Sequence, residues 1–191
     1  MGGLVEPRED WTNQASEHIL NALEKQHSQR GGETTVAEKL ADAGDNLEEL
    51  NDLTALHNAV GGAILLHKYY GGALALPTKK DTFDWTLGES AVEYGAGSDY
   101  DYALFLHVET SFSSGGRKTL QVAGLLSCAV GVCVGVSGGQ QVAFASLVDL
   151  RTGRVSWFNT LVSTVGDIRE AEGAEDMVAR LLGPMMEAEE S

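Results

Sequence analysis

His107 and Glu109 have the spacing that could support acid–base chemistry in this sequence. Residues two apart on a strand share a face, so this imidazole and this carboxylate could pass a proton between them. Surface strands also carry such pairs without any catalytic role. We therefore keep a modest hydrolase using His107 and Glu109 as an alternative hypothesis, to be weighed against a structural role for both side chains.

The other histidines and the cysteines do not form a recognisable metal site. His57 and His67 fall on one expected helix but lie roughly 80° apart around it, without an HExxH motif, so half-exposed helix histidines are expected. Cys128 and Cys133 have no second cysteine pair, which excludes a zinc site of the usual spacing. They form either a disulfide, if their Cα atoms lie within about 7 Å, or buried free thiols, which we favour.

Two motifs for bound phosphate or nucleophilic catalysis are also missing. Residues 113–117, SSGGR, lack the lysine and the spacing of a P-loop, so an ordinary connection is expected there. The sequence contains no GxSxG element that would single out a serine nucleophile. We accordingly assign no catalytic, cofactor-binding or metal-binding residue, and we expect no cofactor.

Composition places the chain among globular, acidic proteins. Of 191 residues, 43% are hydrophobic and 21% charged, which excludes wholesale disorder. Asp and Glu number 28 against 13 Lys and Arg, a formal charge of -15. No cluster of basic residues is present, which argues against binding to nucleic acid or electrostatic docking to anionic lipid.

Local patterns predict that the first half is mainly helical. Apolar residues at helical spacing indicate helices over about 13–29 and 47–70, the latter containing Gly61 and Gly62. Thr35 and Thr86 each stand three residues before a glutamate, the spacing of a capping box that begins a helix.

The second half reads as strands followed by one helix. Alternation predicts a strand from Tyr102 to Phe112. Two β-rich segments, 141–150 and 154–162, flank a short turn in which Gly153 stands where a positive φ is usually needed, so a β-hairpin is expected. A final helix is expected over about 170–182.

These elements predict a single α+β domain over residues 1–191, with a small sheet packed on one face against helices, including the closing one. We divide it into an N-terminal arm (1–10), a mainly helical part (11–100), a sheet-containing part (101–183) and a frayed acidic tail (184–191).

A long uncharged stretch separates Lys118 from Asp149. Its apolar run, 119–136, must lie in a protein core, a protein interface or a bilayer. Small residues recur every fourth position, as in packed membrane helices, at Ala123, Ser127, Gly131 and Gly135. The valines from Val130 to Val136 instead alternate as in a strand, and we favour a core segment. No secretory signal peptide is visible, which predicts a cytoplasmic chain or one that lacks its leader.

Scattered blocks of the chain resemble a family of uncharacterised bacterial cell-envelope proteins, many of them lipoproteins. The blocks are GGQQVAFASLVDLRTGRVSWFN (138–159), YALFLHVETSFSSGGR (102–117), LPTKKDTFDW (76–85) and GGLVEPREDWT (2–12). The pattern AxLVDxxTGxxxW is more distantly similar to envelope lipoproteins of the curli-secretion type, in which the segment forms a hairpin in an α/β domain. Relatives carry a leader and a further strand before the GGLVEPR block, which this sequence does not show.

The resemblance implies an envelope or periplasmic location and a role in protein contacts or assembly. We therefore expect a non-catalytic protein that self-associates, with either the uncharged region or the Trp157–Phe158 strand at a subunit interface. The third hypothesis is a small-ligand carrier with a cavity lined by Leu125, Val132 and Val134.

Overall fold

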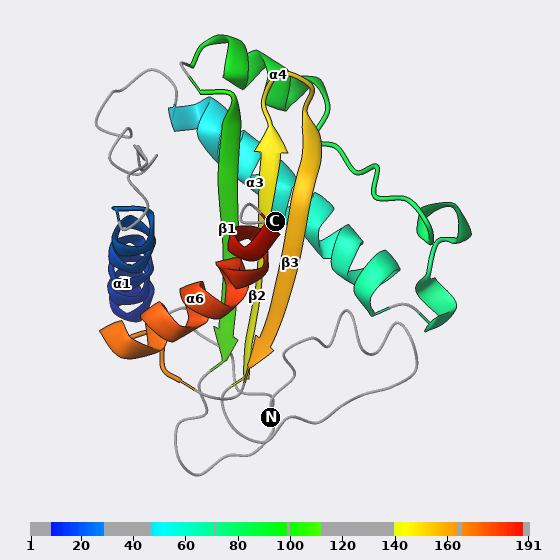
Figure 1. The fold of residues 1–191 in the computed structure, drawn as a ribbon. Helices are drawn as coiled ribbons and strands as arrows, with labels where there is room; N and C mark the ends of the chain where they lie inside the picture. The colour runs from blue at the N-terminus through cyan, green and yellow to red at the C-terminus, as the bar shows by residue number, and fades with distance from the viewer. Residues whose placement is uncertain are drawn as a thin grey trace, which may run out of the picture. The chain divides into compact units, whose positions relative to one another are not determined.

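The computed structural model describes residues 9–28, 47–70, 72–98, 100–111, 140–163 and 166–188. These residues form helices and one three-stranded antiparallel sheet, with the helices dominating the N-terminal half (Figure 1). The predicted α+β class is confirmed. By its internal contacts the chain divides into two compact units, one of Ala43–Thr164 and one of Met1–Asp42 with Val165–Ser191. The predicted boundary at residue 100 does not coincide with this division, and the single domain stays a prediction.

The smaller unit pairs the first helix with the last. Helix α1 (Glu9–Ser28) packs against α6 (Ala171–Ala188). The Arg169 guanidinium lies 4.4 Å from the centre of the Trp11 ring, and its Nε donates a hydrogen bond to Oδ1 of Asp167 at 2.8 Å. Helix α6 continues through Pro184 to Ala188, so residues 184–188, predicted as part of a frayed tail, are helical.

The larger unit begins with a long helix, as the apolar spacing over 47–70 predicts. Helix α3 (Leu47–Ile64) is continued by a π-helical turn, η2 (Leu65–Tyr69). Two short 3₁₀ turns follow, η3 (Gly72–Leu74) and η4 (Pro77–Lys79), and then helix α4 (Glu89–Ala96). The helix predicted after Thr35 lies outside the described residues.

The capping box predicted at Thr86 is wrong. Gly88 is the N-cap of α4, and no side chain bonds to the free amides there. The Thr86 hydroxyl instead donates to the Gly153 carbonyl at 2.8 Å and accepts from the Gly88 N–H at 2.9 Å. The Thr86 hydroxyl therefore bonds to Gly153, which is far away in the sequence, and not to the first turn of the helix, as the local spacing predicted.

The sheet has the order β1–β2–β3, with β1 (Tyr102–Ser111), β2 (Gln140–Asp149) and β3 (Arg154–Ser163) all antiparallel. The predicted strand and the predicted hairpin are both confirmed. In this register Phe105 stands opposite Ser146 and His107 opposite Phe144. The pairing of β2 with β3 shifts between Leu147 and Val148, leaving Ser156 as an extra residue in β3.

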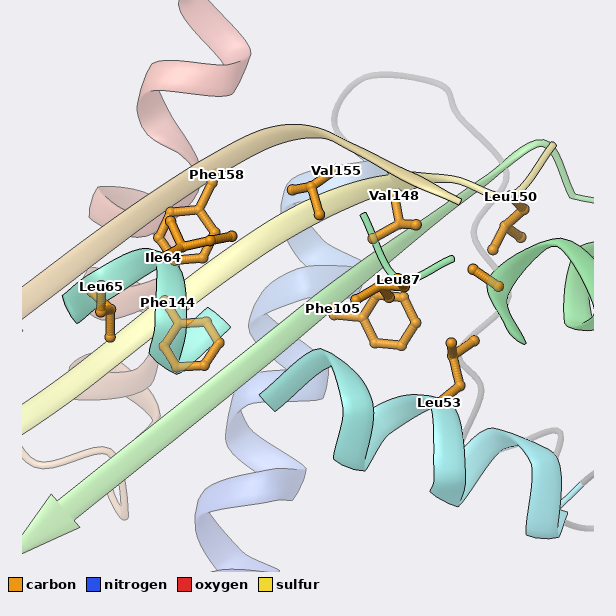
Figure 2. Close-up of a cluster of buried hydrophobic side chains, with 11 residues drawn as sticks. Leu53, Ile64, Leu65, Leu87, Phe105, Phe144, Val148, Leu150, Val155 and Phe158 are labelled. Carbon is orange, nitrogen blue, oxygen red and sulfur yellow. The ribbon is translucent and has the colours of Figure 1, made fainter. Parts of the chain in front are cut away.

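A core of buried apolar side chains fills the space between α3, α4 and one face of the sheet (Figure 2). Phe158 is 7% exposed and stacks on Phe144 at a centroid distance of 5.6 Å. The cluster contains Leu53, Ile64, Leu65, Leu87, Ala91, Phe105, Phe144, Val148, Leu150, Val155 and Phe158. The Phe158 ring therefore packs in the core of its own chain, and the placing of the Trp157–Phe158 strand at a subunit interface stays a prediction.

The uncharged run 119–136, with both cysteines, lies outside the described residues. In the part of the chain that is described, none of the helices has the length and apolar character needed to cross a membrane.

The turn between β2 and β3 gives the first testable prediction. Gly153 has a φ of 69°, and a Cβ there would collide with the Gly88 carbonyl oxygen and lie 3.1 Å from its carbon. We expect Gly153→Ala to lower the free energy of unfolding by about 2–3 kcal/mol, since left-handed strain and a backbone clash add together. Urea denaturation measures this loss.

Gly72→Ala is the matched control. Gly72 has a φ of 65° but open space around it, so only the left-handed strain of about 1–2 kcal/mol should appear. Equal losses in the two variants would contradict the packing of the turn against Gly88.

Candidate functional site

The most polar feature of the core is a histidine–serine pair that joins α3 to β2. Nε2 of His57 lies 2.6 Å from Oγ of Ser146. His57 is 2% exposed and Ser146 is 1% exposed. The prediction of a half-exposed His57 is therefore wrong. The sequence did indicate that His57 could be buried, because it follows Leu53 by one helical turn and so lies on the apolar face of the helix.

Aromatic rings surround the pair. The His57 ring stacks on Phe105 at a centroid distance of 4.7 Å and lies 5.5 Å from Phe144. Burial lowers the pKa of His57 to about 4, the hydrogen bond with Asn58 acts in the opposite sense, and the nearby His107 lowers it further. His57 is therefore neutral at pH 7. The tautomer with its proton on Nδ1 can donate to Asn58 Oδ1, at 3.3 Å, while Nε2 accepts the Ser146 hydroxyl proton.

A serine hydroxyl that donates to an imidazole is the arrangement that activates a nucleophile in many hydrolases. In this protein the serine oxygen is buried under the rings of the core, and a substrate could reach it only if the core opened. The pair instead satisfies two buried polar groups and ties the helix to the sheet. Sequence reasoning missed Ser146, since nothing local distinguishes it from other strand serines.

His107 and Glu109 do share a strand face, but the structure does not assemble them into an acid–base pair. The His107 ring stacks on Phe144 at 4.7 Å and is partly buried, while Glu109 is exposed. Burial lowers the pKa of His107, and the charge of Glu109 acts against that shift. Among the described residues, no hydrogen bond links the two side chains.

His67 is likewise engaged in holding the fold. Its Nδ1 lies 2.7 Å from the Leu74 carbonyl oxygen. The neighbouring Lys68 ammonium donates to the carbonyls of Lys79 and Thr82 at 3.2 and 3.1 Å. Both side chains thus secure the segment that follows the π-helical turn. Within the described ranges, no group of three or more His, Cys, Asp or Glu residues could hold a metal ion.

One exposed surface of the larger unit combines aromatic, apolar and cationic side chains. We define the β1 surface as Tyr100, Tyr102, Leu104 and Arg151; the first three are 44%, 47% and 38% exposed. The Arg151 guanidinium lies 5.8 Å from the centre of the Tyr102 ring. A shallow hollow of about 310 Å³ adjoins it, lined in part by Tyr100 and Arg151.

Two carboxylates lie beside the arginine of this surface. Its Nε lies 3.6 Å from Asp101 and 3.5 Å from Asp149. Both partners raise the pKa of Arg151, Asp149 more strongly than Asp101, so the guanidinium stays charged. Sequence reasoning missed the β1 surface, because Arg151 comes from the hairpin turn and only the strand pairing brings it to Tyr102.

Comparisons with protein-family models, with curated proteins and with solved structures find no match for this chain. The resemblance to envelope lipoproteins therefore stays a prediction. The described residues themselves contain the buried His57–Ser146 pair in the core and the exposed β1 surface. Of these two features, only the β1 surface is open to another molecule.

Proposed function

We propose that this chain is a non-catalytic protein of the bacterial cell envelope that acts through protein contacts, by associating with further copies of itself. The observation that carries the proposal is the β1 surface. The envelope location is supported only by the resemblance of the sequence blocks.

The β1 surface has the makeup of an interface rather than of ordinary solvent-facing structure. Tyrosine and arginine are the residue types most enriched among those that dominate binding energy at protein interfaces. Single exposed apolar residues need no explanation, but here Tyr100, Tyr102 and Leu104 follow one another at alternate positions. Arg151 adds a cation beside the Tyr102 ring, at 5.8 Å from its centre.

Size-exclusion chromatography with light scattering, run without detergent over a range of concentrations, tests this proposal. We expect a soluble dimer or a larger defined oligomer. Tyr102→Ala should weaken association at least tenfold, since truncating a tyrosine that dominates an interface costs about 2 kcal/mol or more and tenfold corresponds to about 1.4 kcal/mol. Tyr70→Ala is the control, because Tyr70 is a 56% exposed tyrosine of the same unit outside the β1 surface.

A monomer at every concentration would overturn the proposed self-association. An oligomer that Tyr102→Ala and Tyr70→Ala affect equally would instead remove the β1 surface from the interface.

A further inference from the structure

The two edges of the sheet differ in how they are covered. The edge formed by β3 is closed by the segment before α4. The Val155 N–H donates to the Trp85 carbonyl at 2.9 Å, and Thr86 forms an isolated bridge with Arg154. Further along, the Tyr69 hydroxyl donates to the Phe158 carbonyl at 3.2 Å. The register shift within β3 also disturbs the regular repeat that an added strand would need.

The edge formed by β1 lacks such protection in the part of the chain that the structure describes. Among the described residues, no segment pairs with its outer side. The strand is ten residues long and pairs with β2 without a register shift. It contains no proline, glycine, lysine or arginine, the residues with which natural edge strands discourage pairing. A regular edge of this length, with Glu109 as its one carboxylate, is a template for another strand.

The sequence of β1 is complementary to itself in the antiparallel direction. A twofold axis at Leu106 would pair residues 102–110 of both copies and keep each side chain on its own face of the sheet. Leu104 would then stand opposite Val108 of the second copy, and Phe105 opposite His107. Glu109, the one carboxylate in the strand, would stand opposite Ala103, so no like charges meet.

We propose that two copies associate by antiparallel pairing of their β1 strands about Leu106, which joins two three-stranded sheets into one continuous sheet of six strands. This inference rests on the proposed self-association and names its geometry. It places Tyr102 of each copy opposite Thr110 of the other, at both ends of the new pairing, so the β1 surface is continuous with it. With a formal charge of -15, the copies repel at long range, and added salt should strengthen the dimer.

A charge exchange at the twofold axis tests this pairing. Leu106→Lys and Leu106→Glu each place two like charges directly opposite one another, roughly 5 Å apart. We expect each variant alone to lose at least a hundredfold in association, and an equimolar mixture to recover a dimer containing one chain of each kind. Light scattering gives the assembly state, and native mass spectrometry distinguishes the mixed dimer from either homodimer.

The matched control is Val162→Lys, which places the same charge on the other edge strand, at a residue that is 47% exposed. It should leave association unchanged. Hydrogen exchange on the unaltered chain gives a second measurement that does not depend on a variant folding. The alternate amides of 102–110 that point away from β2 should gain protection as concentration rises through the association range, while those of β3 should not.

The outcomes separate this inference from the function on which it rests. A wild-type monomer overturns the self-association itself. A wild-type dimer whose β1 amides gain no protection, or that survives Leu106→Lys, overturns the β1 pairing and leaves self-association standing. Folded monomeric variants that fail to recover on mixing overturn the twofold axis at Leu106.

Discussion

Gly61→Ala is expected to cost the larger unit about 3 kcal/mol of stability, at the upper end of the usual range for overpacking a core. A Cβ at Gly61 would overlap the Phe144 ring, lying 2.6 Å from its Cζ. Phe144 is 3% exposed and stacks on both His107 and Phe158, so its ring cannot swing aside. Helix α3 can approach β2 this closely only because position 61 has no side chain.

Gly62→Ala is the control for that change, since the next residue faces open space. In the interior of a helix, alanine is more favourable than glycine by up to about 1 kcal/mol, so this variant should be slightly more stable than the wild type. Urea unfolding followed by circular dichroism compares the two. If Gly61→Ala were as stable as Gly62→Ala, α3 would not pack against Phe144 as described.

Mild acid is expected to destabilise the larger unit by about 3 kcal/mol between pH 7 and pH 4, through His57. Burial lowers the pKa of His57 from 6.5 to about 4 in the folded chain. Below pH 6.5 the unfolded chain therefore binds a proton that the folded chain does not. Stability falls as the pH decreases through this window, by about 1.4 kcal/mol per pH unit for one such group.

The other groups with shifted pKa values do not oppose the loss of stability that His57 causes between pH 7 and pH 4. The pKa of His107 is also lowered by burial, which adds in the same direction, with Glu109 opposing it. Hydrogen bonds with Lys79 and Arg169 lower the pKa values of Asp84 and Asp167. The stability that these carboxylates contribute is lost only below about pH 4, where the unfolded chain begins to protonate them.

The variant His57→Gln tests whether His57 causes the loss of stability in mild acid. Glutamine can still hydrogen-bond to the Ser146 hydroxyl but does not titrate. The variant should be less stable than the wild type at pH 7, because it loses the ring stacking on Phe105. Its unfolding free energy should, however, change much less between pH 6.5 and 4.5. A wild-type protein equally stable at both pH values would show that His57 is not buried in the neutral form.

The elements that local patterns predicted are those in which neighbouring residues decide the conformation. Helical spacing of apolar residues placed a helix over 47–70, and α3 with its π-helical turn occupies that range. Alternation placed a strand at Tyr102, and a glycine between two β-rich segments placed the hairpin, where Gly153 does adopt a positive φ.

Predictions failed where a distant residue competed for the same group. Thr86 had the spacing to cap a helix, yet its hydroxyl bonds to Gly153, which is close to it only after the hairpin has formed. His57 was expected to be half-exposed on its helix, but it is buried, and its Nε2 lies 2.6 Å from the Ser146 hydroxyl oxygen of β2. In both cases the free energy that separates the locally favoured arrangement from its alternative is small compared with that of the contacts formed on folding.

The features of the candidate site can also be separated into those that local sequence determines and those that depend on distant contacts. By itself, the sequence determined an acidic α+β chain with an alternating strand from Tyr102, because composition and periodicity are local properties. Only the tertiary structure decided that His57 is buried against Ser146, 89 residues away, and that Arg151 lies over Tyr102. It also decided that, among the described residues, segments outside the sheet bond to β3 while none pairs with the outer side of β1. Strand order and helix packing depend on which surfaces meet, and a sequence pattern specifies only which surfaces are apolar.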